Sequence, residues 1–220
     1  MPSTPREPLL NIPPLTLLFG ATMLVCFGLL QLPALFEPAV ILFSFVPKAF
    51  SQNPAQESYR LLTHAWLHFG WPHLIMNGFG LLAFGSGVER LMGKRIFTIV
   101  LFGGVIIGAL GHWALYTQST DPLGGASAGI SALFGCILPL LAQRRDLIIA
   151  TLVFIGMNVI IGTMGMADEP GLAIAWQAHI FGFAFGMLCF RFIVSKARDT
   201  VPAEEPPAPA ATDEAVNPWQ

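Results

Sequence analysis

The sequence predicts an all-α polytopic membrane protein, in which six transmembrane helices form one bundle and both chain termini lie in the cytoplasm. Only 11% of the 220 residues are charged and 54% are hydrophobic, whereas roughly 25% of the residues of a soluble domain are charged. Residues 15–194 hold too few charges to cover a water-exposed surface, so the bilayer must solvate most of the chain. The number of spans and their orientation follow from the lengths of the charge-free stretches and from the placement of the basic residues.

Six stretches without charge can each hold a helix near the roughly 20 residues that cross about 30 Å of hydrocarbon. They are residues 14–36, 61–88, 96–120, 122–143, 147–167 and 171–190. The start of the chain has one arginine and several prolines, which disfavours a cleaved signal peptide. The apolar stretch 38–47 is too short to cross, so we expect it in the interface or folded against the bundle.

Lysine and arginine set the orientation. With six spans the termini share one side, which holds nine basic residues, and the other side holds only Lys48 and Arg60. Because basic residues concentrate in cytoplasmic loops, both termini are expected in the cytoplasm. The predicted parts are a cytoplasmic segment 1–13, a membrane domain 14–194 and a disordered tail 195–220 that is rich in proline, alanine and acidic residues. We expect a multi-pass protein of the cell membrane, as in a bacterial inner membrane.

Polar side chains within apolar spans point to function, because they need partners in hydrocarbon. His73 and Asn77 are four residues apart, so a helix places them on one face near the outer end of the second span. The simpler alternative is a structural hydrogen-bonding pair between helices. Pro72 fits the first turn of that helix, where its missing N–H has no consequence.

Ser127 lies among small residues in the sequence GGASAG. The helix that begins there has N–H groups in its first turn that lack helical acceptors and favour a negative charge. Only residues 127–142, roughly 24 Å of helix, separate it from the cytoplasmic arginines, so it should lie below the outer surface in a water-filled recess. A packing seam of small residues is the alternative.

His179 lies in the last span, one turn before Gly182, which forms a GxxxG seam with Gly186. Close packing along this seam can bring His179 against the helix of Ser127, although a buried histidine can also be a core residue. A serine needs a base to become a nucleophile, and imidazole titrates near neutral pH. His73 and Asn77 can supply donors to the oxyanion that forms on attack. No acidic residue is placed to orient His179, so we expect a dyad rather than a triad.

These residues resemble those of the rhomboid intramembrane serine proteases over about residues 59–190. The resemblance rests on HxxxN at 73–77, GxS at 125–127 and AHxxG at 178–182, in this order on spans two, four and six. The run YRLLTHAWLHF at 59–69 and VER at 88–90 add to it.

The resemblance implies a six-helix rhomboid-like bundle that cleaves transmembrane protein substrates near their outer ends. It also implies a Ser127–His179 dyad and an oxyanion hole formed by His73 and Asn77, with no cofactor or metal.

The sequence departs from the family pattern at two positions. Ala128 stands where the family's GxSG has glycine, and Ser131 stands where an aromatic residue often packs on the base. Something else must therefore orient His179, and Trp176 and Phe181 are the candidates.

Several alternatives remain. The first is a catalytically silent rhomboid-like membrane binder or chaperone of transmembrane helices. The second is a zinc site at His64, His68 and His73, which is disfavoured because the sequence has no HExxH motif and no acid near these histidines. The third is a transporter, which is disfavoured because the intramembrane charge pairs of a proton-coupled carrier are missing. The net charge of −2 makes nucleic acid an unexpected partner. Glu89 and Arg90 are expected to form an ion pair, and the oligomeric state is left open.

Overall fold

The computed structural model describes residues 11–164 and 175–200. Most of the expected cytoplasmic segment 1–13 and residues 201–220 of the expected tail 195–220 lie outside these ranges, whereas residues 195–200 are helical. The described residues form helices, and the one β contact among them is an isolated bridge between Phe45 and Leu123. The prediction of an all-helical membrane protein is confirmed.

The helices follow the order of the predicted spans, with short helices inserted after the first. They are α1 (Pro14–Leu30), α2 (Pro33–Phe43), α3 (Pro47–Gln52), α4 (Pro54–Glu57), α5 (Arg60–Thr63), α6 (Trp71–Gly80), α7 (Ser86–Met92), α8 (Lys94–Leu115), α9 (Ser127–Leu141), α10 (Arg144–Met164) and α11 (Trp176–Thr200). A 3₁₀ turn at His64–Trp66 follows α5, and a π-helical stretch at Leu81–Gly85 joins α6 and α7 into one continuous run. A π-helical stretch inside a helix often marks a functional site.

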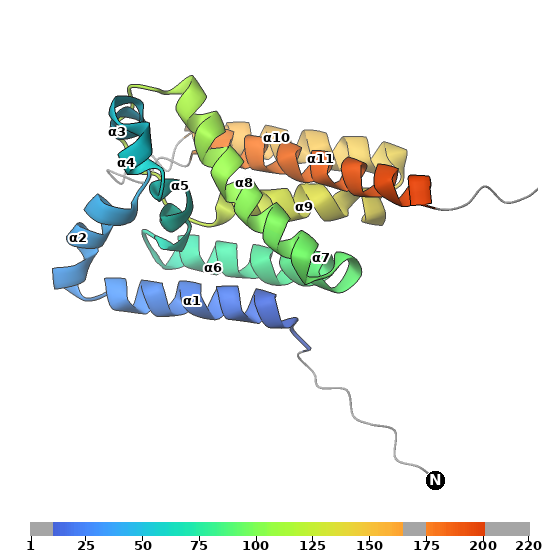
Figure 1. The fold of residues 1–220 in the computed structure, drawn as a ribbon, viewed down its shortest axis with the longest axis horizontal. Coiled ribbons are helices and arrows are strands. Elements are labelled where there is room, and N and C mark those ends of the chain that lie inside the picture. Colours follow the sequence, from blue (N-terminus) through green and yellow to red (C-terminus); the bar gives the residue numbers. More distant parts are fainter. Residues whose placement is uncertain (1–10, 165–174, 201–220) are drawn as a thin grey trace, which may run out of the picture.

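Three of the described helices are long and apolar enough to cross a membrane, over Lys94–Leu115, Arg144–Thr163 and Trp176–Ile193. The helices α1 and α9 are apolar but shorter. In Figure 1, α1, α6, α9, α10 and α11 run along the bundle, and α8 crosses them at a slant. The start of α1 and the end of α11 lie at one end of the bundle, and α2 to α5 gather at the other.

The first predicted span is too long at its C-terminal end. The helix α1 ends at Leu30, and a second helix begins at Pro33 and covers most of the apolar stretch 38–47, for which we expect a place in the interface or against the bundle. Proline is well suited to the first turn of a helix because its missing N–H would have no partner there. Pro33 therefore starts α2 and divides what the charge pattern shows as one segment.

Close packing of α9 against α11 depends on the glycines of the predicted seam. A Cβ atom at Gly182 would overlap the carbonyl oxygen of Ala128, and one at Gly186 would overlap that of Ala132. Only glycine allows the backbones to approach this closely. The seam therefore fixes α11 against the first turns of α9, as the sequence indicated.

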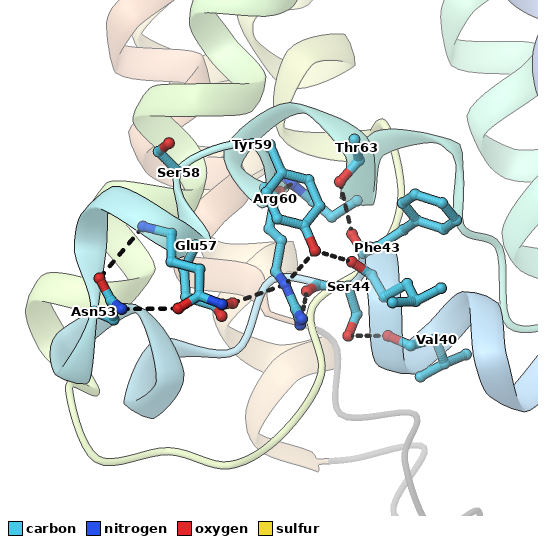
Figure 2. A network of polar contacts seen from close by, with 12 residues as sticks. Val40, Phe43, Ser44, Asn53, Glu57, Ser58, Tyr59, Arg60 and Thr63 are labelled. Carbon is cyan, nitrogen blue, oxygen red and sulfur yellow. Dashed lines mark hydrogen bonds and ion pairs between the residues drawn. The ribbon is translucent and has the colours of Figure 1, made fainter.

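Polar contacts fasten the loop between α1 and α6 (Figure 2). The hydroxyl of Tyr59 donates to the carbonyl of Leu42 at 2.7 Å, and Thr63 Oγ1 donates to the carbonyl of Phe43 at 3.0 Å. Arg60 donates to the carbonyl of Ser44 at 3.2 Å and pairs with Glu57 at 2.7 Å. These bonds use carbonyls at the C-terminal end of α2, which have no helical partner of their own. They hold α5 against α2.

The same loop is bonded to the segment that leads into α9. Phe45 and Leu123 exchange two backbone hydrogen bonds of 3.1 and 2.8 Å, and the N–H of Gly125 donates to the carbonyl of His64 at 2.9 Å. Residues far apart in sequence thus brace the segment immediately before Ser127.

The expected ion pair of Glu89 with Arg90 does not form. Glu89 is buried, and its carboxylate accepts bonds from the N–H of Leu15 at 3.0 Å, the N–H of Thr16 at 2.8 Å and the hydroxyl of Thr16 at 2.9 Å. Free N–H groups at a helix N-terminus favour a negative charge. Glu89 therefore caps α1 from a different helix.

Candidate active site

Ser127 is the first residue of α9. The first backbone bond of this helix runs from the N–H of Ile130 to the carbonyl of Ala126, so the N–H groups of the first turn have no helical partner. These groups carry the positive end of the helix dipole. The hydroxyl of Ser127 is half-buried and stands beside a backbone that favours a developing negative charge.

His179 lies in the first turn of α11 and faces Ser127. The hydroxyl oxygen of Ser127 and Nε2 of His179 are 2.7 Å apart. This distance is a short hydrogen bond, in which the serine can donate to the ring nitrogen. The structure thus brings together the two side chains that the sequence selects as nucleophile and base.

His73 packs against the segment that precedes the serine. Gly125 has a φ of +109°, a conformation that L residues with a side chain rarely adopt, and a Cβ atom there would lie 2.5 Å from Nε2 of His73. Glycine at this position therefore lets the imidazole ring approach the backbone two residues before Ser127. The pattern GxS thus has a second physical reason besides helix packing.

Asn77 is buried one turn after His73 on the same helix. Its Nδ2 donates to the carbonyl of His73 at 2.8 Å, which uses one of the two N–H bonds of the amide. Its Oδ1 is buried and has no partner among the residues that the structure describes. A second N–H of the amide is left for another acceptor, as an oxyanion donor requires.

One further residue of this site was not predicted from the sequence. Asn158 of α10 places Oδ1 at 2.7 Å from Nδ1 of His179, on the opposite side of the ring from Ser127. The available signal was an amide within the fifth apolar span, since polar groups in such spans need partners. The direction in which it faces depends on the rotation of α10, which the sequence pattern leaves undetermined.

The two aromatic residues proposed to orient His179 pack elsewhere. A Cβ atom at Gly111 of α8 would overlap the ring of Phe181, and one at Gly162 of α10 would overlap the ring of Trp176. Ser131, which stands at the family's aromatic position, is buried on α9. The described contacts of these two rings are with α8 and α10, and the suggestion that either ring aligns the base stays a prediction.

His64 and His68 make contacts within the segment that leads from α5 to α6. Nδ1 of His64 bonds the carbonyl of Arg60 at 2.7 Å, and Nδ1 of His68 bonds the carbonyl of Trp66 at 3.2 Å. Burial lowers the pKa of His64 to about 4, because a charged ring would lose its hydration there. Within residues 11–164 and 175–200, no group of three or more His, Cys, Asp or Glu side chains is arranged to hold a metal ion.

Comparisons with known proteins give one family. The model of the Rhomboid domain matches residues 55–196. The chain is 33% identical over 153 residues to YdcA of Bacillus subtilis, an alignment that covers 64% of this chain and 69% of that protein. It is 32% identical over 149 residues to the rhomboid protease GluP of the same organism, covering 68% of this chain and 28% of GluP. It is 27% identical over 180 residues to the rhomboid protease GlpG of Klebsiella pneumoniae, covering 76% of this chain and 59% of GlpG.

Proposed function

Because the chain belongs to the rhomboid family, we propose that it is an intramembrane serine endopeptidase that cleaves transmembrane-helix substrates near their outer ends. The observation that carries this proposal is the 2.7 Å separation between the hydroxyl oxygen of Ser127 and Nε2 of His179. A hydroxyl group becomes a strong nucleophile when an adjacent base removes its proton.

The proposed reaction begins when Nε2 of His179 takes the proton of Ser127 and the serine oxygen forms a bond to the scissile carbonyl carbon. The tetrahedral intermediate collapses, the C–N bond breaks, and the imidazolium returns the proton to the departing amine. Water then attacks the acyl-enzyme by the same route, with His179 again as base. The released products are one new amine and one new carboxylate.

The oxyanion of the intermediate needs donors already in place. We assign this role to His73, to the free N–H of Asn77 and to the N–H groups of the first turn of α9. Three observations support the assignment: the ring of His73 lies against Gly125, Asn77 is buried on the same helix, and no helical acceptor uses the first N–H groups of α9. No metal or cofactor enters this scheme.

The proposal also covers the number of membrane spans and the side of the membrane on which the termini lie. We propose six membrane spans formed by α1, the α6–α7 run, α8, α9, α10 and α11, with both termini on the cytoplasmic side of a cell membrane. The charge distribution and the placement of the start of α1 and the end of α11 at one end of the bundle support this topology. The proposed partners are the lipid bilayer and transmembrane protein substrates. Because a helical carbonyl is already hydrogen-bonded, these substrates should carry helix-weakening residues near the cut.

Cleavage by reconstituted protein tests the function. Wild type, Ser127→Ala and His179→Ala are placed in vesicles with a panel of single-span substrates, and the fragments are identified by mass spectrometry. The proposal requires cleavage near the outer end of the substrate helix by wild type and at least a 10³-fold loss in each variant. If wild type binds the substrates without cutting any of them, a catalytically silent binder of transmembrane helices is the correct description.

A further inference from the structure

We propose that Asn158 is a positioning residue for the reaction: its side-chain oxygen holds the imidazole of His179 with Nδ1–H toward α10 and the unprotonated Nε2 toward Ser127. This inference rests on the proposed function. It assigns a role to a residue outside the elements by which the chain resembles its family. The geometry is a chain of three hydrogen bonds that joins α10, α11 and α9.

The orientation of the Asn158 amide follows from its first contact. One end of the amide lies 2.9 Å from the carbonyl oxygen of Phe154 on the same helix. A carbonyl oxygen only accepts hydrogen bonds, so the end that faces it must be the NH₂ group. The other end, which faces His179, is therefore the amide oxygen.

The tautomer of His179 follows from the second contact. An amide oxygen only accepts, so Nδ1 at 2.7 Å must carry the proton of the neutral ring. Nε2 is then the bare nitrogen, and it faces the hydroxyl of Ser127 at 2.7 Å. This is the protonation state that a general base needs before the reaction. When Nε2 takes the serine proton, the bond to Asn158 becomes charge-assisted and stabilises the imidazolium.

No other described contact performs this task. The rings of Trp176 and Phe181 pack against glycines of α10 and α8. Ser127 and Asn158 are the two hydrogen-bonding partners of the His179 ring among the described residues. Without Asn158 the ring would be free to adopt the other tautomer, as happens in serine proteases whose orienting acceptor is replaced.

The bond also depends on how α10 is docked. Phe154, Asn158 and Gly162 recur every four residues, so they share the face of α10 that contacts the bundle. Phe154 stacks on Phe183 with ring centroids 4.7 Å apart, and Gly162 accommodates Trp176. None of the residues in the apolar window Arg144–Thr163 is fully buried. A shift of α10 away from α11 would therefore remove the acceptor from His179, so the alignment of the base depends on the docked position of α10.

The test compares Asn158→Leu, which has a similar size and no acceptor, with Asn158→Asp, which keeps an acceptor oxygen in nearly the same place. Met157→Leu, at an exposed neighbouring position on α10, is the control. Each variant is reconstituted with a substrate that wild type cleaves, and kcat, KM, the pH profile of kcat/KM and the rate of fluorophosphonate labelling at Ser127 are measured. Unfolding temperature reports whether each variant folds.

We expect Asn158→Leu to lose about 10²-fold in kcat and in labelling rate with KM unchanged, since a misaligned base loses most of its contribution. Asn158→Asp should retain cleavage, and the acid limb of its pH profile should move to higher pH, because a carboxylate stabilises the protonated ring more than an amide does. Met157→Leu should match wild type.

The proposal is overturned if folded Asn158→Leu cleaves with the kcat of wild type, or if Asn158→Asp shows the wild-type acid limb. The second readout decides even if Asn158→Leu does not fold. A different result tests the proposed function: it is contradicted if Ser127→Ala still cleaves the substrate. Loss of cleavage in Ser127→Ala together with full activity in Asn158→Leu would leave the peptidase function intact and remove only the role of Asn158.

Discussion

The hydroxyl of Ser127 lies 2.7 Å from Nε2 of His179, although 52 positions separate the two residues in the chain. The first residue of α9 and the first turn of α11 meet because α11 packs on α9 through glycines, with Gly182 against the backbone of Ala128. The geometry of the candidate active site is therefore a consequence of helix packing, and changes in the seam should reach the site.

Gly182→Ala tests the seam. Its Cβ atom would overlap the carbonyl oxygen of Ala128, so α11 must move away from α9. Overpacking of this kind costs about 1–3 kcal/mol, and we expect a lower unfolding temperature together with a loss of peptidase activity. Gly78→Ala is the matched control, because a Cβ atom there meets nothing within 4 Å. Equal stability and activity in the two variants would contradict the packing argument.

Asn77→Ala tests the oxyanion hole. If the free N–H of Asn77 stabilises the tetrahedral intermediate, its removal should lower kcat by about 10²-fold or more and leave KM nearly unchanged. The measurement is the cleavage rate at saturating substrate, with Gly78→Ala as a neighbouring control on the same helix. An effect confined to KM would instead place Asn77 in substrate binding.

Glu89→Ala tests the cap on α1. The variant leaves the N–H groups of Leu15 and Thr16 without their acceptor, and loss of a cap costs about 0.5–2 kcal/mol. We expect the unfolding temperature of Glu89→Ala to fall and that of Arg90→Ala to stay near wild type. A similar fall in both variants would contradict the capping role of Glu89 and would instead support an ion pair between Glu89 and Arg90.

His64 should make stability depend on pH. Its pKa is about 4 in the folded protein against an ordinary 6.5, so the unfolded chain binds more protons between these values. The stability that the folded protein gains by keeping His64 neutral is fully present above pH 6.5 and is lost as pH falls toward 4. Unfolding temperatures measured from pH 8 to 4.5 should decline below about pH 6.5, and His64→Gln should flatten that decline. An unchanged slope in the variant would assign the acid sensitivity to other groups.

Much of this arrangement could be predicted from local sequence. Charge-free stretches locate the long helices, and the small residues around Ser127 and Gly182 indicate that the two backbones approach each other. The spacing of His73 and Asn77 places them on one face of a helix, which the structure shows. These inferences succeed because they depend on periodicity and residue size, which are properties of neighbouring positions.

The features missed from the sequence depend on tertiary structure. The adjacent charges of Glu89 and Arg90 suggest an ion pair, yet the free N–H groups of α1 lie within reach of the Glu89 carboxylate. Asn158 is one amide in an apolar span, and only the rotation of α10 decides that it faces His179. The charge-free stretch does not show where α1 ends, because Pro33 can either lie within one long helix or start a new one. In each case several local outcomes were physically allowed, and packing selected one of them.

The most direct test of the proposed chemistry is covalent labelling in membranes. A fluorophosphonate reacts with a serine whose hydroxyl has been activated by a base, and mass spectrometry of the digested protein identifies the modified residue. We predict one adduct, on Ser127, that forms in wild type and is absent from His179→Ala with the fold retained. Labelling that fails in folded wild type, or that proceeds equally in His179→Ala, would contradict a serine nucleophile activated by His179.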